Sequence, residues 1–115
     1  MGALPVAVAD RAAPGFAIAF QPIVDIAGRR IVAQEALVRG IGGGSAASVL
    51  SRVEGGQRFG LEIAIARHAL ARAVALGIET DLHVNFSPGV LLHTPDVLSA
   101  IAMVAEVENF PIGQL

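Results

Sequence analysis

Hydrophobic and polar residues alternate along three segments of the chain, at residues 16–26, 30–39 and 81–87. Alternation with a period of two, in segments rich in β-branched and aromatic residues, is typical of half-buried β-strands. Only the turn sequence Ala27-Gly28-Arg29 separates the first two segments, so these are predicted to form a hairpin. In each segment one set of alternate side chains is apolar and the other contains polar groups. The pattern therefore predicts three strands with one apolar face each.

Helices are predicted for three other segments, at residues 46–54, 58–76 and 95–108. Ser45 is a suitable N-cap for the first, and Gly77 follows the second where a left-handed residue commonly ends a helix. Thr94 followed by Pro95 is typical of the start of the third. The final residues, IGQL, resemble the approach to a further strand. The order β-β-α-α-β-α predicts an α/β fold, either a barrel or an open sheet.

The polar faces of the predicted strands hold the candidate functional groups. These faces contain Gln21 and Asp25 on the first strand, Glu35, Leu37 and Arg39 on the second, and His83, Asn85 and Ser87 on the third. In an α/β barrel such faces would converge at the barrel mouth, where active sites lie. On adjacent parallel strands, a glutamate and an asparagine supply oxygen ligands for Mg²⁺ or Mn²⁺. An arginine four residues beyond the glutamate, on the same strand face, suits a phosphate.

Simpler interpretations of these residues remain open. Glu35 and Arg39 are four residues apart on one strand face, so they could simply pair with each other. His83 is expected to form a hydrogen bond rather than bind a ligand, and Asp25 is expected to support the turn that follows it. On the long helix, one polar arc contains Arg58, Glu62, His68 and Arg72, and His68 is expected to be solvated. Arg67 falls on the apolar side, where it either extends its head group to water or lies at an interface.

Composition limits the classes of function. The 115 residues suffice for one small domain, and with 54% hydrophobic and 16% charged residues the chain is neither disordered nor a coiled coil. A net charge of −2 without a basic stripe gives no attraction to nucleic acid. There is no cysteine, and all eight basic residues are arginine, which excludes chemistry that needs a thiolate or a lysine of this chain. No uncharged apolar run approaches membrane-spanning length, so we expect a soluble, cytoplasmic protein without membrane contact.

Two longer motifs are specific enough to indicate a family. The string QPIVDIAGRRIVAQEALVRG, residues 21–40, and HVNFSP, residues 83–88, resemble signatures of the EAL-domain family of bacterial cyclic di-GMP phosphodiesterases. The family takes its name from the tripeptide found here as Glu35-Ala36-Leu37. The resemblance covers about residues 16–115, and residues 1–15 are expected to form a flexible leader.

The resemblance implies a fold, a reaction and a set of site residues. The implied fold is α/β, part of a (β/α)₈ TIM-like barrel of EAL type, whose first strand is antiparallel to its neighbours. The implied reaction is metal-dependent hydrolysis of cyclic di-GMP to pGpG, with Mg²⁺ or Mn²⁺ as cofactor. By matched position, Glu35 and Asn85 would bind metal, Arg39 would hold a phosphate, and Gln21 and Leu37 would line the substrate pocket.

The sequence also departs from the family pattern. The later family signatures, which include a further glutamate, an Asp-Asp pair and a lysine, do not follow, and Gly40 stands where the family often has an aromatic residue. We therefore expect a truncated domain that binds cyclic di-GMP weakly and is inactive alone. The alternative is a non-catalytic EAL module that acts in protein–protein interaction or regulation. An open half-barrel leaves strand edges and apolar faces uncovered, which predicts a homo-oligomer or docking on another protein domain.

Overall fold

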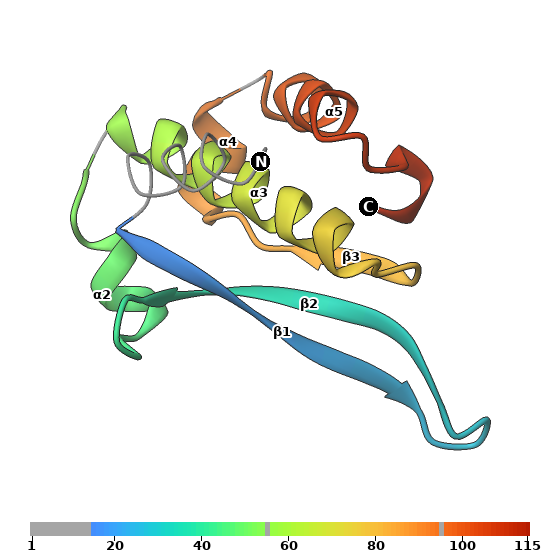
Figure 1. The fold of residues 1–115 in the computed structure, drawn as a ribbon. Helices are drawn as coiled ribbons and strands as arrows, with labels where there is room; N and C mark the ends of the chain where they lie inside the picture. The colour runs from blue at the N-terminus through green and yellow to red at the C-terminus, as the bar shows by residue number, and fades with distance from the viewer. Residues whose placement is uncertain (1–14, 55, 95) are drawn as a thin grey trace, which may run out of the picture.

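The computed structural model describes residues 15–54, 56–94 and 96–115, so the predicted leader lies outside the described residues except for Gly15. These residues form a mixed α/β fold around a three-stranded sheet in the order β1-β2-β3 (Figure 1). The strands are β1 (Phe16–Asp25), β2 (Arg30–Gly40) and β3 (Asp81–Val84). The predicted antiparallel first strand is confirmed, because β1 runs antiparallel to β2 whereas β3 runs parallel to β2.

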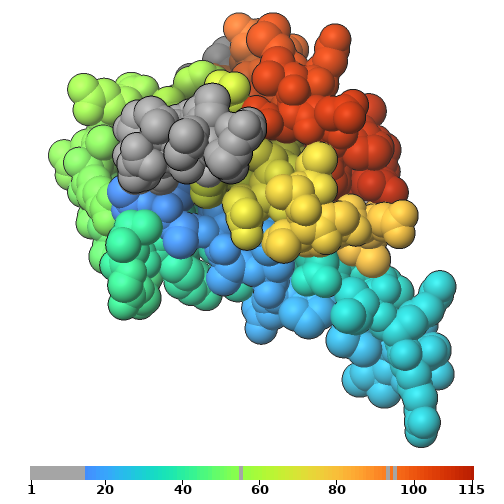
Figure 2. Space-filling view, in the orientation of Figure 1, coloured from blue at the N-terminus to red at the C-terminus, as the bar shows by residue number. Residues whose placement is uncertain are grey.

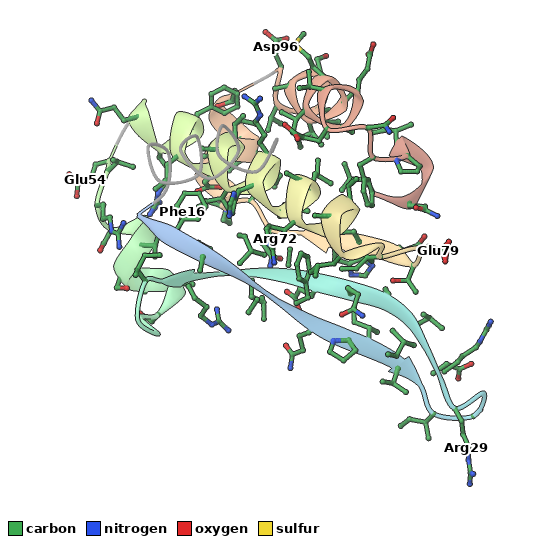
Figure 3. All side chains as sticks on the ribbon, viewed as in Figure 1. Phe16, Arg29, Glu54, Arg72, Glu79 and Asp96 are labelled. Carbon is green, nitrogen blue, oxygen red and sulfur yellow. The ribbon has the colours of Figure 1, made fainter. Side chains whose placement is uncertain are left out.

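The hairpin of β1 and β2 is the longest feature of the sheet. Its register pairs Gln21 with Glu35, and a bulge interrupts the pairing between Ile23 and Val24. Arg29 closes the turn with a left-handed φ of 53°, and its label marks the tip of the hairpin in Figure 3. This tip stands away from the rest of the molecule (Figure 2). The turn is therefore remote from the part of the sheet that β3 and the helices cover.

The helices of the described residues are α2 (Ala46–Leu50), α3 (Gln57–Leu76), α4 (Pro88–His93) and α5 (Val97–Val107), followed by the 3₁₀ turn η1 (Ile112–Gln114). Ser45 caps α2 as predicted, because its Oγ accepts a hydrogen bond from the Ser48 amide. Gly77 ends α3 in the left-handed region, with φ 71° and ψ 30°, also as predicted.

The apolar faces of the strands pack against α3. The main cluster of buried residues comes from the sheet, α3, α5 and the segment after α5, and contains Ala36, Ala69, Leu70, Ala73, Leu82, Ala105 and Phe110. A second cluster joins the other end of the sheet to α2 and α3, and contains Phe16, Val38, Val49 and Ile65. Because Ala36, Val38 and Leu82 belong to the predicted apolar faces, the opposite faces that carry Glu35, Arg39 and Asn85 point away from the helical layer.

Several boundaries differ from the sequence-based expectations. The strand predicted at 81–87 ends at Val84, and α2 ends four residues earlier than expected. Pro88 begins a short helix, α4, for which no element was predicted. The C-terminal residues form η1 and not the approach to a strand. His68 is half-buried rather than solvated, because its ring meets Phe16 edge to face with centroids 5.6 Å apart.

Candidate functional site

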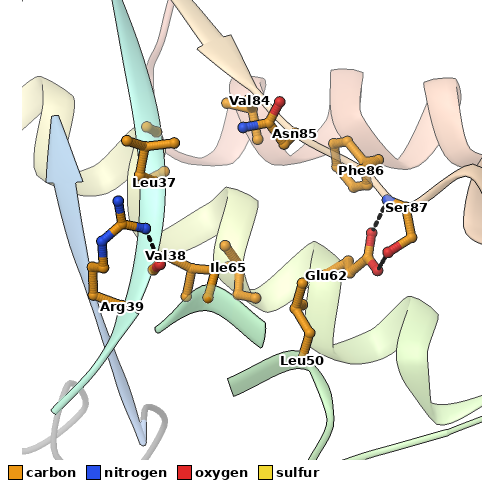
Figure 4. Close-up of a pocket in the computed structure, with 13 residues that line it drawn as sticks. Leu37, Val38, Arg39, Leu50, Glu62, Ile65, Val84, Asn85, Phe86 and Ser87 are labelled. Carbon is orange, nitrogen blue, oxygen red and sulfur yellow. Dashed lines mark hydrogen bonds between the residues drawn. The ribbon is translucent and has the colours of Figure 1, made fainter. Parts of the chain in front are cut away.

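The candidate site lies at the carboxyl ends of the two parallel strands. Pairing between β2 and β3 stops at Ala36 and Val84, after which β2 continues to Gly40 while the chain after β3 turns away. A cavity of about 220 Å³ opens where the two segments separate (Figure 4). Its polar lining comes from β2, α3 and the segment after β3, and contains Arg39, Glu62, Asn85 and Ser87.

The two predicted metal ligands lie together beside this cavity. The Asn85 side chain donates a hydrogen bond from Nδ2 to Oε2 of Glu35, with 2.9 Å between the two atoms. Parallel pairing brings them together, because Glu35 lies opposite His83 in the register and Asn85 is two residues further along the same face. Residues that are 50 positions apart in the sequence thus form one polar pair.

The chemistry of this pair suits a hard cation only in part. A carboxylate and an amide are oxygen donors of the kind that Mg²⁺ and Mn²⁺ prefer. Within the described residues, however, no group of three or more His, Cys, Asp or Glu side chains is placed to hold a metal ion. His83 is exposed and does not complete such a group. Glu35 and Asn85 could therefore supply only two of the ligands that such a cation would need.

Arg39 and Leu37 line the cavity from β2. The Arg39 guanidinium is half-buried and donates one hydrogen bond from Nη1 to the carbonyl oxygen of Val38 at 2.8 Å (Figure 4). The simpler interpretation, an ion pair between Arg39 and Glu35, is not what the structure shows. Within the described ranges the ion pairs are Arg30–Asp25, Arg58–Glu62 and Arg67–Glu108. One bond to a carbonyl leaves the charge of Arg39 without a carboxylate partner in this part of the chain.

The two candidate site residues on β1, Gln21 and Asp25, lie in different parts of the sheet. Gln21 lies directly opposite Glu35 in the hairpin and is exposed, so it borders the Glu35–Asn85 pair. Asp25 lies at the far end of the sheet, where its carboxylate is 3.9 Å from Arg30, its register partner beside the turn. The cause is the antiparallel direction of β1. The carboxyl end of β1 lies at one end of the sheet, and the carboxyl ends of β2 and β3 lie at the other.

Sequence analysis missed one residue of the site, Glu62. Although it was placed on a polar arc, its side chain is only 3% exposed. Both carboxylate oxygens accept hydrogen bonds from Ser87, one from the backbone amide at 2.6 Å and one from the hydroxyl. Arg58, one turn earlier on α3, lies 3.8 Å from the same carboxylate and donates to the Leu50 carbonyl oxygen at 3.1 Å. The available signal was a lone acid on a helix that is otherwise mostly apolar near its centre.

No family model matches the chain, and no curated protein matches it. Solved structures do. BlrP1 from Klebsiella pneumoniae, in a complex with manganese and cyclic di-GMP, is 26% identical with a TM-score of 0.77 over 89% of this chain and 26% of its own. The calcium and cyclic di-GMP complex of the same protein has a TM-score of 0.78, with 26% identity over 88% of this chain and 26% of its own.

A standalone versatile EAL protein from Vibrio cholerae O395, bound to cyclic di-GMP, is 35% identical. Its TM-score is 0.74 over 86% of this chain and 42% of its own. The chain thus spans less than half the length of each of these proteins. Both BlrP1 and the Vibrio protein are EAL-domain proteins. The resemblance of this chain to the EAL-domain family is therefore confirmed by structure as well as by sequence identity.

Proposed function

We propose that this chain forms the part of an EAL-type domain that holds one edge of a cyclic di-GMP site. The observation that carries the proposal is the hydrogen bond between Asn85 and Glu35 beside a cavity that Arg39 also lines. Similar solved proteins were crystallised with cyclic di-GMP and with manganese or calcium, which supports this ligand class.

The barrel belongs to the same proposal. Two parallel strands joined through a helical crossover, with α3 on one sheet face and polar groups on the other, are the repeating unit of a (β/α)₈ barrel. We infer that β1, β2 and β3 are the first strands of such a barrel, in which Glu35 and Asn85 face the interior near its mouth.

Each residue has a distinct role in this proposal. Glu35 and Asn85 would hold a divalent cation, which when bound activates water and neutralises phosphate charge. The planar fork of Arg39 would bind two phosphate oxygens, and the partner it has now, one backbone carbonyl, costs little to give up. Leu37 would contact the ligand from the cavity wall and Gln21 from the neighbouring strand.

We further infer that the 115 residues bind cyclic di-GMP without hydrolysing it. Two protein ligands fix a cation loosely, and the acid and lysine signatures that complete the family site are absent from this sequence. Incubation of the purified chain with cyclic di-GMP and Mn²⁺, followed by chromatography, is expected to yield no pGpG. Turnover above a buffer control would overturn this inference.

Titration calorimetry tests the site directly. Cyclic di-GMP should bind more tightly with Mn²⁺ than with EDTA, and Glu35→Gln should remove that difference. Arg39→Ala should weaken binding about tenfold, as expected for the loss of charge-assisted hydrogen bonds. The matched control is Arg72→Ala, which removes the same charge from an exposed position on α3. Equal losses in both arginine variants, or no binding by the native chain, would contradict the proposed function.

A second candidate function is a non-catalytic interaction module, and exposed apolar side chains favour it. Leu92, Leu98 and Met103 on α4 and α5 are 78%, 74% and 67% exposed. So much apolar surface on consecutive elements is typical of a face that contacts another protein. Under this alternative the cation and cyclic di-GMP would have no effect, whereas removal of these side chains would abolish association.

A further inference from the structure

Glu62 is a buried carboxylate with an unusual set of partners. Within the described part of the chain it is the one buried residue with a charged or polar side chain. Burial of a carboxylate is costly unless charged or hydrogen-bonding groups compensate for the lost water. Here both oxygens are engaged by a single residue, Ser87, and Arg58 lies against one of them. The carboxylate of this helical residue is fully paired, and its partners lie just beyond the end of β3. The packing of α3 alone does not require such an arrangement.

The contact fixes the direction of the chain after β3. Once pairing with β2 ends at Val84, the next amides have no sheet partner, and Glu62 supplies the acceptor for the amide of Ser87. Because the hydroxyl of Ser87 binds the second oxygen, both the backbone and the χ1 angle of this residue are held (Figure 4). Asn85 is two residues earlier, so its position depends on where Ser87 is anchored.

We propose that Glu62 is a positioning residue for the site: it anchors Ser87 to α3, and thereby holds the Asn85 amide against Glu35. The expected effect on cation and ligand binding rests on the proposed function. The positioning of Asn85 itself involves only residues of this chain. Arg58 extends the anchor, because it connects the Glu62 carboxylate to the carbonyl oxygen of Leu50 at the end of α2.

The chemistry of the anchor selects the informative variants. Ser87→Ala removes the hydrogen bond that the hydroxyl donates to Glu62 and leaves the one that the backbone amide donates, so the chain should still fold. Ser87→Thr restores the hydroxyl, and the extended backbone of Ser87, with φ −63° and ψ 142°, suits a β-branched residue. Glu62→Gln is the stronger change, because its NH₂ group turns one acceptor into a donor that faces other donors. Glu106→Gln is the matched control at an exposed position on α5.

The test uses the full chain and two readouts. The first is the NMR signal of the Asn85 side-chain amide, identified by its loss in Asn85→Ala; the second is Mn²⁺ affinity by calorimetry. Ser87→Ala should move the Asn85 signal toward that of a solvated asparagine and weaken Mn²⁺ binding about fivefold, as expected for one hydrogen bond. Glu62→Gln should do so more strongly, whereas Ser87→Thr and Glu106→Gln should match the native chain.

The outcomes separate the two hypotheses. If Ser87→Ala and Glu62→Gln lower only the melting temperature and leave the Asn85 signal unchanged, Glu62 is merely structural and the positioning role is overturned. If the native chain binds no Mn²⁺, the proposed function fails, and the Asn85 signal alone then decides whether Glu62 positions this residue.

Discussion

Asn85 fixes one oxygen of Glu35 at the candidate site. Its Nδ2 is committed to Glu35, so its Oδ1 and the second oxygen of Glu35 have no hydrogen-bond partner within the described residues. Oxygen acceptors of this kind are the ligands that a hard cation prefers. Because Asn85 contributes an amide and not a second carboxylate, the pair is free of repulsion between like charges.

Replacing that amide by its isosteric acid tests this interpretation. In Asn85→Asp a second carboxylate would lie about 3 Å from Glu35, where like charges repel. We expect the melting temperature in EDTA at pH 7 to fall by about 5 °C. Millimolar Mn²⁺ should restore it and stabilise the variant more than the native chain, because the cation binds only the folded pair.

Differential scanning fluorimetry with and without Mn²⁺ measures both effects. Asn109→Asp is the control, since Asn109 lies beyond α5 with a φ of 60°, a conformation that aspartate also tolerates. A variant at Asn85 that behaves like this control in both conditions would show that the Glu35 contact is absent in solution.

The sequence indicated the candidate side chains more readily than it indicated their partners. Glu35, Arg39 and Asn85 were identified because strand alternation fixes which side chains share a face, and the structure brings Glu35 and Asn85 into contact. Burial of Glu62 was not predictable from helical periodicity, because its compensation comes from Ser87, which is 25 residues away in the sequence. Local pattern determines orientation, whereas the partners of a buried charge depend on tertiary structure.

At the scale of elements, α3 is the support for the whole site. It packs against the sheet through Ala69 and Ala73, which are fully buried, so the helix can approach the strands closely. Its C-terminus is set by Gly77, whose amide donates to the carbonyl oxygen of Val74 at 3.1 Å. Because Glu62 lies on this helix, the stability of α3 bears directly on the anchor of Ser87.

Two glycines of this region should respond in opposite directions to the same substitution. Gly77→Ala forces a side chain into the left-handed region and should lower the free energy of unfolding by about 1 kcal/mol. Gly60→Ala places a methyl group in open space within α3 and should raise it by about 0.5–1 kcal/mol. Urea denaturation monitored by circular dichroism measures both, and changes of the same sign would contradict the described end of α3.

The ion pair between α3 and α5 is expected to contribute little. Arg67 Nε lies 2.6 Å from Oε2 of Glu108, but the arginine side chain is 62% exposed, so water screens the attraction. Arg67→Ala should therefore change the free energy of unfolding by less than about 1 kcal/mol. The same urea experiment measures it, and a loss above 2 kcal/mol would show that this contact holds α5 in place.

Element boundaries were less predictable than element types. The alternation at 81–87 continues past Val84, so the sequence pattern does not show that β3 ends there. The strand ends because β2 and the following segment separate, and because the Ser87 amide binds Glu62 instead of a strand neighbour. The hairpin, by contrast, was predicted to within one residue at its strand ends, since its turn and its two alternating segments are local features, although the bulge between Ile23 and Val24 was not expected.

At the scale of the whole molecule, the sheet has two free edges and an uncovered face among the residues that the structure describes. In the order β1-β2-β3, β3 has a neighbour on one side only. A groove of about 760 Å³ runs beside it and is lined by apolar side chains that include Leu82, Leu91, Leu98, Ile101 and Ile112. The polar face of β2 and β3, with Glu35 and Asn85, is likewise open. No helix of the described residues is long and apolar enough to cross a membrane.

Exposed apolar surface of this extent predicts self-association of the isolated chain. Light scattering coupled to gel filtration should give a mass above that of the monomer at tens of micromolar chain, because burial of the groove removes apolar area from water. The double variant Leu91→Ser with Leu98→Ser should shift the mass toward the monomer. Ile26→Ser is the control, since Ile26 is 86% exposed at the remote hairpin turn. A monomeric native chain, or equal effects of both variants, would show that this groove does not drive association.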